Sequence, residues 1–328
     1  MMRKLVIFIC LILTAGAVTV AAEEADGGYA GAFLQVPAGA RPTAMGGAYL
    51  AVSNDGAAPL FNPAGLAGLR RPLVGTSYRA MQLDRSLGYV TAVFPVQGEA
   101  ALGVHWLYAG YGSVEARDSD GDLLGRDIDQ SNHQFTIVFA KRFERLFSLG
   151  INLSYIAAKM PKMDVNSVGF DFGTMIYLDQ LFDRERREDM PVKDMRLALT
   201  VRNIAKEFHW GSDNYLHAYT VDLVGHEQID KVPYELGLGA SARFFQRKLM
   251  LATDLVKTEH QSLVFRGGGE YFLVPELALR GGYGDGRFTA GTGYLFKVGK
   301  HQLVIDYAFS TDKADEGSEH IFSFDFLY

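Results

Sequence analysis

The chain has 328 residues, a formal net charge of −6, 12% aromatic residues and 36 glycines. The acidic balance argues against a nucleic-acid-binding protein, for which a concentrated basic patch is expected. With only 10 prolines, this composition favours a β-rich chain over a helical one.

The N-terminus, residues 1–22, has the pattern of a secretory signal peptide. Basic residues precede an apolar run over residues 5–13, and small residues follow up to Ala22. We predict cleavage after Ala22, which also removes Cys10, so that disulfides and thiol chemistry are excluded from the mature chain. No later stretch approaches the roughly 18 consecutive apolar residues of a membrane-spanning helix. The export signal leaves a periplasmic protein, a secreted protein and an outer-membrane barrel open.

Residues 40–69 are rich in alanine and glycine, nearly uncharged, and without a period of two. Pro42 followed by residues 43–52 predicts a short helix, which the turn-forming run 53–56 interrupts. Asn62-Pro63-Ala64 predicts a second helical start, because Asn caps free N–H groups and Pro suits the first helical position. Such a compact segment ahead of many strands indicates an insert that packs inside a narrow space.

At these residues the chain resembles a known family. The motif R-P-T-A-M-G-G-A-Y at 41–49, followed by D-G-A-A-P-L-F-N-P-A-G-L at 55–66, is similar to the N-terminal signature of PorV/PorQ-type proteins, which belong to the FadL-like outer-membrane β-barrels. The resemblance implies a 14-stranded transmembrane barrel with a small N-terminal hatch of short helices in its lumen. The hatch motif comprises Gly46, Gly47, Asn62, Pro63, Ala64 and Gly65. The implied organisation is a signal peptide over 1–22, the N-terminal segment and hatch over 23–71, and the barrel over 72–328.

From residue 73 onward, alternating apolar and polar residues predict fourteen strands of about 8 to 12 residues, the length that crosses a bilayer when tilted. They are placed at 73–80, 87–94, 101–108, 134–140, 148–155, 168–173, 196–202, 235–244, 249–257, 262–272, 277–283, 288–296, 302–309 and 320–328. The even count is typical of outer-membrane barrels, as are long connections on one side, here 109–131 and 205–231. The charged segment 179–194 falls on the other side and reads most simply as a solvated turn, with a docking surface for a periplasmic partner as the alternative. A secreted β-sandwich shares the period of two but buries its apolar face in a core.

The last strand ends in alternating aromatic residues. These are Phe322, Phe324, Phe326 and Tyr328. The pattern resembles the C-terminal assembly signal of bacterial outer-membrane proteins. We therefore predict a monomeric barrel in the outer membrane of a diderm bacterium, with the barrel assembly machinery and outer-membrane lipids as partners.

The inward face of the predicted strands carries both signs of charge. The acids are Asp171, Glu235, Asp254, Glu270, Asp306 and Asp325, and the bases are Arg196, Arg202, Arg243, Arg266 and Arg280. An ion-selective pore would show a ring of a single sign. Because charges in a confined interior must pair, we predict a structural network that locks barrel and hatch together.

No catalytic constellation or metal-ligand spacing is present, so we expect no enzyme activity, cofactor, metal or nucleic-acid partner. The glycines at 237, 239, 281, 282 and 284 only superficially match nucleotide loops, because neither run opens a helix. Asp118, Asp120, Asp122 and Asp129 partly match a calcium loop, but Leu123 stands where glycine is needed. A solvated acidic loop is the simpler interpretation.

The resemblance leaves two functions open. FadL-like proteins take up hydrophobic small molecules, which pass from a pocket beside the hatch through the barrel wall. Phe33, Leu34, Leu60, Phe61 and Leu66 could supply such an apolar pocket, although hatch packing explains them equally well. PorV-type relatives serve type IX secretion and bind exported cargo proteins, for which Phe208, Trp210, Tyr215 and Tyr219 in loop 205–231 offer a surface. Uptake or export of hydrophobic molecules is favoured as the wider family role.

Overall fold

The structure, a computed structural model, describes residues 30–112, 114–118, 120–128, 130–160, 163–211, 227–311 and 317–328. The predicted signal peptide, Asp129, Tyr215 and Tyr219 lie outside this part of the chain. Within it, no helix has the length and apolar character to cross a membrane.

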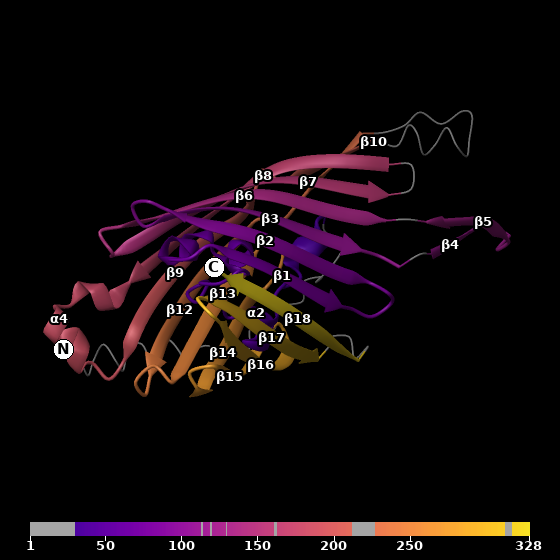
Figure 1. Cartoon of the computed structure of the whole chain (residues 1–328). Coiled ribbons are helices and arrows are strands. Elements are labelled where there is room, and N and C mark those ends of the chain that lie inside the picture. The colour runs from indigo at the N-terminus through magenta and orange to yellow at the C-terminus, as the bar shows by residue number, and fades with distance from the viewer. Residues whose placement is uncertain are drawn as a thin grey trace.

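Fourteen strands form a closed antiparallel barrel, in which β1 pairs with β18 to complete the circle (Figure 1). The strands are β1 (Leu73–Ala80), β2 (Ser86–Val96), β3 (Ala100–Gly110), β6 (Ser131–Phe143), β7 (Phe147–Met160), β8 (Met163–Tyr177), β9 (Lys193–Ile204), β12 (Glu235–Phe244), β13 (Leu249–Thr258), β14 (Leu263–Val274), β15 (Leu277–Gly284), β16 (Arg287–Val298), β17 (His301–Thr311) and β18 (Ser318–Leu327). The predicted barrel and all of its strands are confirmed, with ends that shift by a few residues.

Two further hairpins lie within the long connections at one end of the barrel, which we call the hairpin end. There β4 (Val114–Arg117) pairs with β5 (Leu123–Ile128), and β10 (Glu207–Gly211) pairs with β11 (Glu227–Lys231). The opposite end, called the turn end, carries short turns and α4 (Arg184–Asp189), as Figure 1 shows.

The charged segment 179–194 is folded and is more than a turn. It contains η4 (Leu178–Leu181) and α4, and Met190, Val192 and Met195 pack with Ala242 beneath them. The sequence does not predict this small core, because its apolar residues are scattered among charged ones without a periodic pattern.

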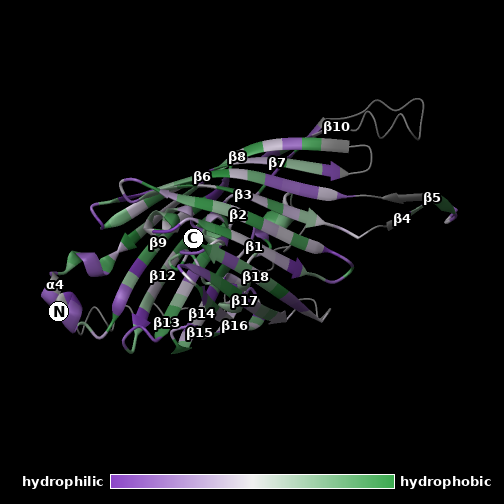
Figure 2. Cartoon of the chain, viewed as in Figure 1, coloured by the Kyte–Doolittle hydropathy of each residue, from purple (hydrophilic) through white to green (hydrophobic). Residues whose placement is uncertain are grey.

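The wall has an apolar outer face and a polar or small-residue inner face. In β3 the outward side chains of Leu102, Val104 and Trp106 are 46%, 53% and 40% exposed, whereas Gly103 and His105 between them are buried. Figure 2 shows this alternation along the strands. A soluble sandwich would bury its apolar face, so the exposed apolar face contradicts that alternative and matches a wall covered by lipid.

The chain enters the barrel before its first strand, and residues 30–69, called the hatch, lie inside (Figure 1). The hatch contains η2 (Ala32–Gln35), α2 (Ala40–Ala44), α3 (Ala58–Phe61) and η3 (Pro63–Gly68). The helix predicted over 43–52 is wrong in extent, because α2 ends at Ala44 and turns follow. Gly46 and Gly47, with φ of 64° and 76°, cause this break.

Candidate functional site

The hatch fits against the wall through glycines on both partners. Gly46 and Gly47 supply the positive φ values of the hatch turn. On the wall, a Cβ atom at Gly268 or Gly282 would clash with the hatch backbone at Met45 and Gly46. Because packed interiors leave no space for an extra group at such a contact, neither partner tolerates a side chain here.

The same fit recurs around the barrel. The wall glycines whose added Cβ would clash with hatch atoms are Gly150, Gly173, Gly237, Gly239, Gly268, Gly282, Gly284 and Gly291. Sequence reasoning interprets these only as ordinary strand glycines and misses this role. The signal that could have found them is their inward register, since glycine in a strand often marks close approach of another backbone.

Asn62 joins two hatch turns to the wall. Its Oδ1 accepts a hydrogen bond from the Ala64 amide at 3.1 Å, the capping contact expected of Asn-Pro-Ala. Its Nδ2 donates to the Leu50 carbonyl at 2.9 Å and to the Thr174 carbonyl of β8 at 3.0 Å. Asn62 is wholly buried, so all of these hydrogen bonds are shielded from water. Pro63 lies beside Gly150 of β7.

A continuous ion network anchors α2 to β14, β15 and β17. The Arg41 guanidinium donates to both Glu270 oxygens, at 2.9 Å and 3.0 Å. Glu270, which is 0% exposed, also accepts from Arg280 at 2.8 Å, and Arg280 donates to Asp306 at 2.6 Å. Arg41 reaches Asp55 within the hatch at 3.1 Å. Each buried charge has an opposite charge, which is the condition for burying it.

Tyr49 completes the hatch side of this network. Its hydroxyl donates to Asp55 and accepts from Arg41 at 3.0 Å. Burial raises the pKa of the Tyr49 hydroxyl well above its usual value, against the opposing effect of the Arg41 charge. Tyr49 therefore keeps its proton, and remains a donor, to higher pH than a solvent-exposed tyrosine.

Most of the other predicted lumen charges also contact the hatch. Two acids accept hydrogen bonds from hatch amides: Asp254 from Tyr49 and Leu50 at 2.7 Å and 3.0 Å, and Asp325 from Gly56 at 3.1 Å. Arg196 donates to the Val52 carbonyl at 3.3 Å. Arg202 donates to the Leu60 carbonyl and to Glu235, the latter at 2.8 Å. Two arginines differ. Arg243 lies 3.8 Å from Asp194 near the turn end, and Arg266 makes no ion pair with any residue that the structure describes.

Asp171, the remaining predicted lumen charge, lies where the hydrogen-bond ladder between β8 and β9 is interrupted. The register shifts between Phe170 and Phe172, and side chains close the break. Asp171 Oδ1 accepts from the Asn203 amide at 2.8 Å and from Lys206 Nζ at 3.0 Å. Lys206 packs over Gly169, where a Cβ would displace it. Sequence reasoning missed Lys206, because it follows the predicted strand and no periodicity assigns it a face.

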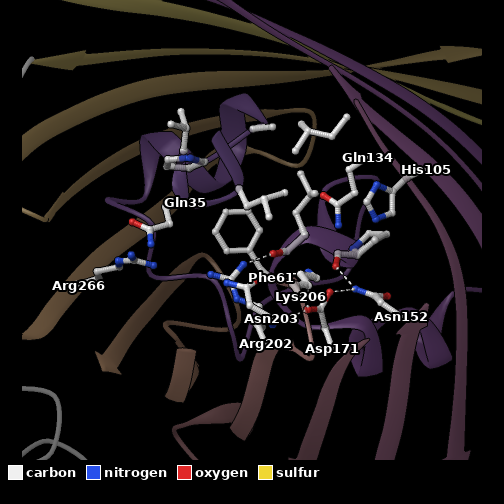
Figure 3. A pocket seen from close by; sticks show the side chains of 17 residues that line it. Gln35, Phe61, His105, Gln134, Asn152, Asp171, Arg202, Asn203, Lys206 and Arg266 are labelled. Carbon is white, nitrogen blue, oxygen red and sulfur yellow. Dashed lines mark hydrogen bonds and ion pairs between the residues drawn. The ribbon is translucent and has the colours of Figure 1, made fainter. Parts of the chain in front are cut away.

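Two cavities lie in the lumen on the hairpin-end side. The hatch cavity, of about 40 Å³, is shown in Figure 3. The larger one, called the vestibule, has about 270 Å³ and is lined by residues of η2, β1, β13, β14 and β16. Gln35, Val36, Pro37 and Arg266 line both cavities, so the N-terminal part of the hatch divides them.

The residues predicted to form an apolar pocket are spread over the hatch. Leu34, Leu60 and Phe61 line the hatch cavity. Phe33 packs with Leu87, Leu107, Ile156 and Phe208 in a cluster at the hairpin end, called the apolar sector. Leu66 packs with Val93 and Val138 in another cluster. Polar residues make up about half of the lining of the hatch cavity, so the apolar pocket stays a prediction.

A groove of about 570 Å³ lies on the outer face of the wall. It is lined by side chains of six strands, from Val74 of β1 to Val168 of β8, with Trp106, Phe135 and Tyr155 among them. Its lining is almost wholly apolar. Val168 places one end of the groove close to the broken ladder at Phe170.

The C-terminal aromatic residues extend the outer face to the end of the chain. Phe322, Phe324 and Tyr328 are exposed, and Phe326 contacts the rings of His301 and Tyr328. Over the described residues, no group of three or more His, Cys, Asp or Glu side chains could hold a metal ion.

The fold is similar to those of a solved hydrocarbon channel, a toluene transporter and a FadL homologue. CymD, a monoaromatic hydrocarbon channel, has a TM-score of 0.60 at 12% identity, over 89% of this chain and 97% of that chain. The toluene transporter TbuX of Ralstonia pickettii has 0.56 at 14%, over 88% and 97%. A FadL homologue of Pseudomonas aeruginosa has 0.57 at 13%, over 89% and 98%. No family model and no curated relative matches the sequence. At such identities the likeness concerns the fold, and function depends on the site.

Proposed function

We propose that this chain is an outer-membrane channel for hydrophobic small molecules, with the hairpin end outside the cell and the turn end in the periplasm. The observation that carries the proposal is a barrel lumen closed by the hatch, with the apolar sector packed against the start of the hatch at the hairpin end. A closed lumen excludes an open pore for ions and sugars, whereas the outer groove offers apolar solutes an apolar surface. The solved neighbours with transport titles, TbuX and CymD, support the same class of solute.

The exit that we propose leads through the wall at the break between β8 and β9. The hatch cavity is lined there by Asp171, Asn203 and Lys206, which are the side chains that close the break. Opening it requires only these side-chain contacts and few backbone hydrogen bonds to part, since regular pairing stops near Phe170. The outer groove begins close by at Val168 and offers an apolar solute a surface in the membrane.

Uptake measurements test this function. The full chain, expressed in a bacterium that lacks its own hydrocarbon channel, should increase the initial rate of labelled toluene uptake. Uptake of a labelled sugar of similar size should not change, because the lumen is closed. An uptake rate of toluene equal to that of cells without the chain would contradict the proposal.

The secretion alternative has no observation in its favour. Of its proposed surface, Phe208 is buried in the apolar sector, and Tyr215 and Tyr219 lie outside the described residues. The barrel assembly machinery and outer-membrane lipids remain the proposed partners, for which the exposed C-terminal aromatic residues and the apolar outer face are the support.

A further inference from the structure

His105 is a buried histidine for which the described part of the chain offers no hydrogen-bond partner. Its side chain points inward from β3, is 4% exposed and lines the hatch cavity (Figure 3). Nδ1 is enclosed without a partner, and neither ring nitrogen bonds to a residue in the described ranges. Its neighbour is the ring of Tyr89, with centroids 5.4 Å apart. Buried polar groups are normally hydrogen-bonded because an unmade bond is unfavourable, so the imidazole calls for a partner from the cavity.

Most of the other polar groups near His105 have partners within the described residues, and the exception is Asn152 Oδ1, a buried acceptor without one. Asn152 Nδ2 donates to Asp171 Oδ2 at 3.1 Å and to the Pro59 carbonyl at 2.8 Å. Gln134 Nε2 donates to Ser154 Oγ at 3.0 Å. The carboxylate of Asp171 is balanced by Lys206. A ligand on this side therefore needs no charge, only a group that can bond to an imidazole.

The opposite side of the cavity is formed by Gln35 and Arg266, as Figure 3 shows. Arg266 also lines the larger vestibule, where water can solvate its charge. Phe61 lies between the two polar sides in Figure 3, and Leu34 and Leu60 of the hatch also line the cavity. An occupant thus meets a polar group at one end and apolar surface along its body.

We propose that the hatch cavity recognises the hydroxyl group of a small neutral apolar molecule, a phenol or an alcohol, with His105 as its hydrogen-bond partner. This inference rests on the proposed function and narrows its substrate class. The cavity of about 40 Å³ holds a water or a hydroxyl group, since a water needs at least about 10–15 Å³. A hydroxyl group that displaces the water reproduces its bond to His105, whereas a hydrocarbon does not and loses affinity.

Toluene and para-cresol test the proposal, because they differ only in a hydroxyl group. Their dissociation constants are measured by calorimetry with the full chain in detergent micelles. We expect para-cresol to bind about tenfold more tightly, as a hydrogen bond to a buried partner implies. In His105→Phe the ratio should fall to about one. In the control His133→Phe, which changes an outward residue of β6 stacked on Trp106, the tenfold ratio should persist.

A crystal structure with para-bromophenol gives a second measurement that needs no variant. The anomalous signal of bromine should place the ligand against the hatch cavity, with its hydroxyl group in the cavity and its oxygen about 3 Å from a ring nitrogen of His105. Equal affinities for the two ligands, an unchanged ratio in His105→Phe, or a bromine signal elsewhere would each overturn the proposal. Toluene uptake by cells without any preference for para-cresol would overturn this inference and leave the proposed function intact. Selective binding at His105 without uptake of either compound would overturn the function alone.

Discussion

Lys206 Nζ lies 3.0 Å from Asp171 Oδ1, and both side chains are buried where the ladder between β8 and β9 breaks. Asp171 accepts two further hydrogen bonds, from the Asn203 amide on the shifted strand and from Asn152. At this place the Lys206–Asp171 pair therefore holds β8 and β9 together, as backbone hydrogen bonds hold neighbouring strands together elsewhere in the wall.

The first prediction concerns this pair. Lys206→Met should lower the free energy of unfolding by about 3 kcal/mol or more, because it leaves the Asp171 carboxylate buried without its cation. Adding Asp171→Asn should recover part of the loss. Unfolding in urea, followed by tryptophan fluorescence in micelles, measures both. The control is Lys231→Met, whose partner Glu207 is 3.4 Å away at an exposed site, where a loss below about 1 kcal/mol is expected. Equal losses at the two sites would show that the pair does not hold the break.

The second prediction concerns Arg280, which bridges Glu270 and Asp306. Arg280→Met should cost about 3 kcal/mol or more, since two buried carboxylates lose their shared cation. Glu270→Gln in the same chain should restore some stability, because Arg41 then no longer has to balance the charge alone. Lys297→Met, which breaks an exposed pair with Glu276, serves as the control and should leave the urea midpoint unchanged. A double variant no more stable than Arg280→Met would contradict this account.

The third prediction uses the raised pKa of the Tyr49 hydroxyl. In the unfolded chain tyrosine ionises at about pH 10, while in the folded chain Tyr49 keeps its proton to higher pH. The unfolded state thus binds fewer protons above pH 10, and stability falls as pH rises through that range. Tyr49→Phe should be less stable at neutral pH, having lost the bonds to Asp55 and Arg41, but its stability should fall less steeply in alkali. The difference in free energy of unfolding between the unaltered chain and Tyr49→Phe, measured by urea unfolding, should become smaller as the pH rises above about 10. A constant difference would mean that Tyr49 ionises normally.

The sequence predicts the barrel well because one rule governs it. Each strand alternates between lipid and lumen, so the apolar residues of β3 or β18 mark their own face, and each predicted charge of the lumen follows from the same alternation. The pairing of those charges does not follow, because Arg41 and Glu270 are brought together only by the path of the hatch.

The hatch is the harder part to predict. Its turns depend on Gly46 and Gly47 at positive φ, and a run that reads as one helix over 43–52 becomes α2 and a series of turns. Lys206 and Asn203 escape prediction for a related reason. They follow a β-bulge, and a shift in register by one residue reverses the face that alternation assigns.

The last prediction concerns the closure of the lumen and uses two neighbouring glycines of β15. Gly282 faces the hatch, and a Cβ there would clash with the Met45–Gly46 backbone, whereas the nearest atom to a Cβ at Gly281 would be the Thr289 carbonyl oxygen at 3.9 Å. Gly282→Val should push the hatch off the wall and raise the ion conductance of the protein in a planar bilayer. Gly281→Val faces outward and should leave the unaltered protein's low conductance in place. A chain without residues 30–69 sets the upper limit, since it lacks the hatch altogether. Both valine variants should keep the heat-dependent gel mobility of a closed barrel, because neither changes a backbone donor. If the chain without the hatch conducts no more than the unaltered protein, the hatch does not close the lumen.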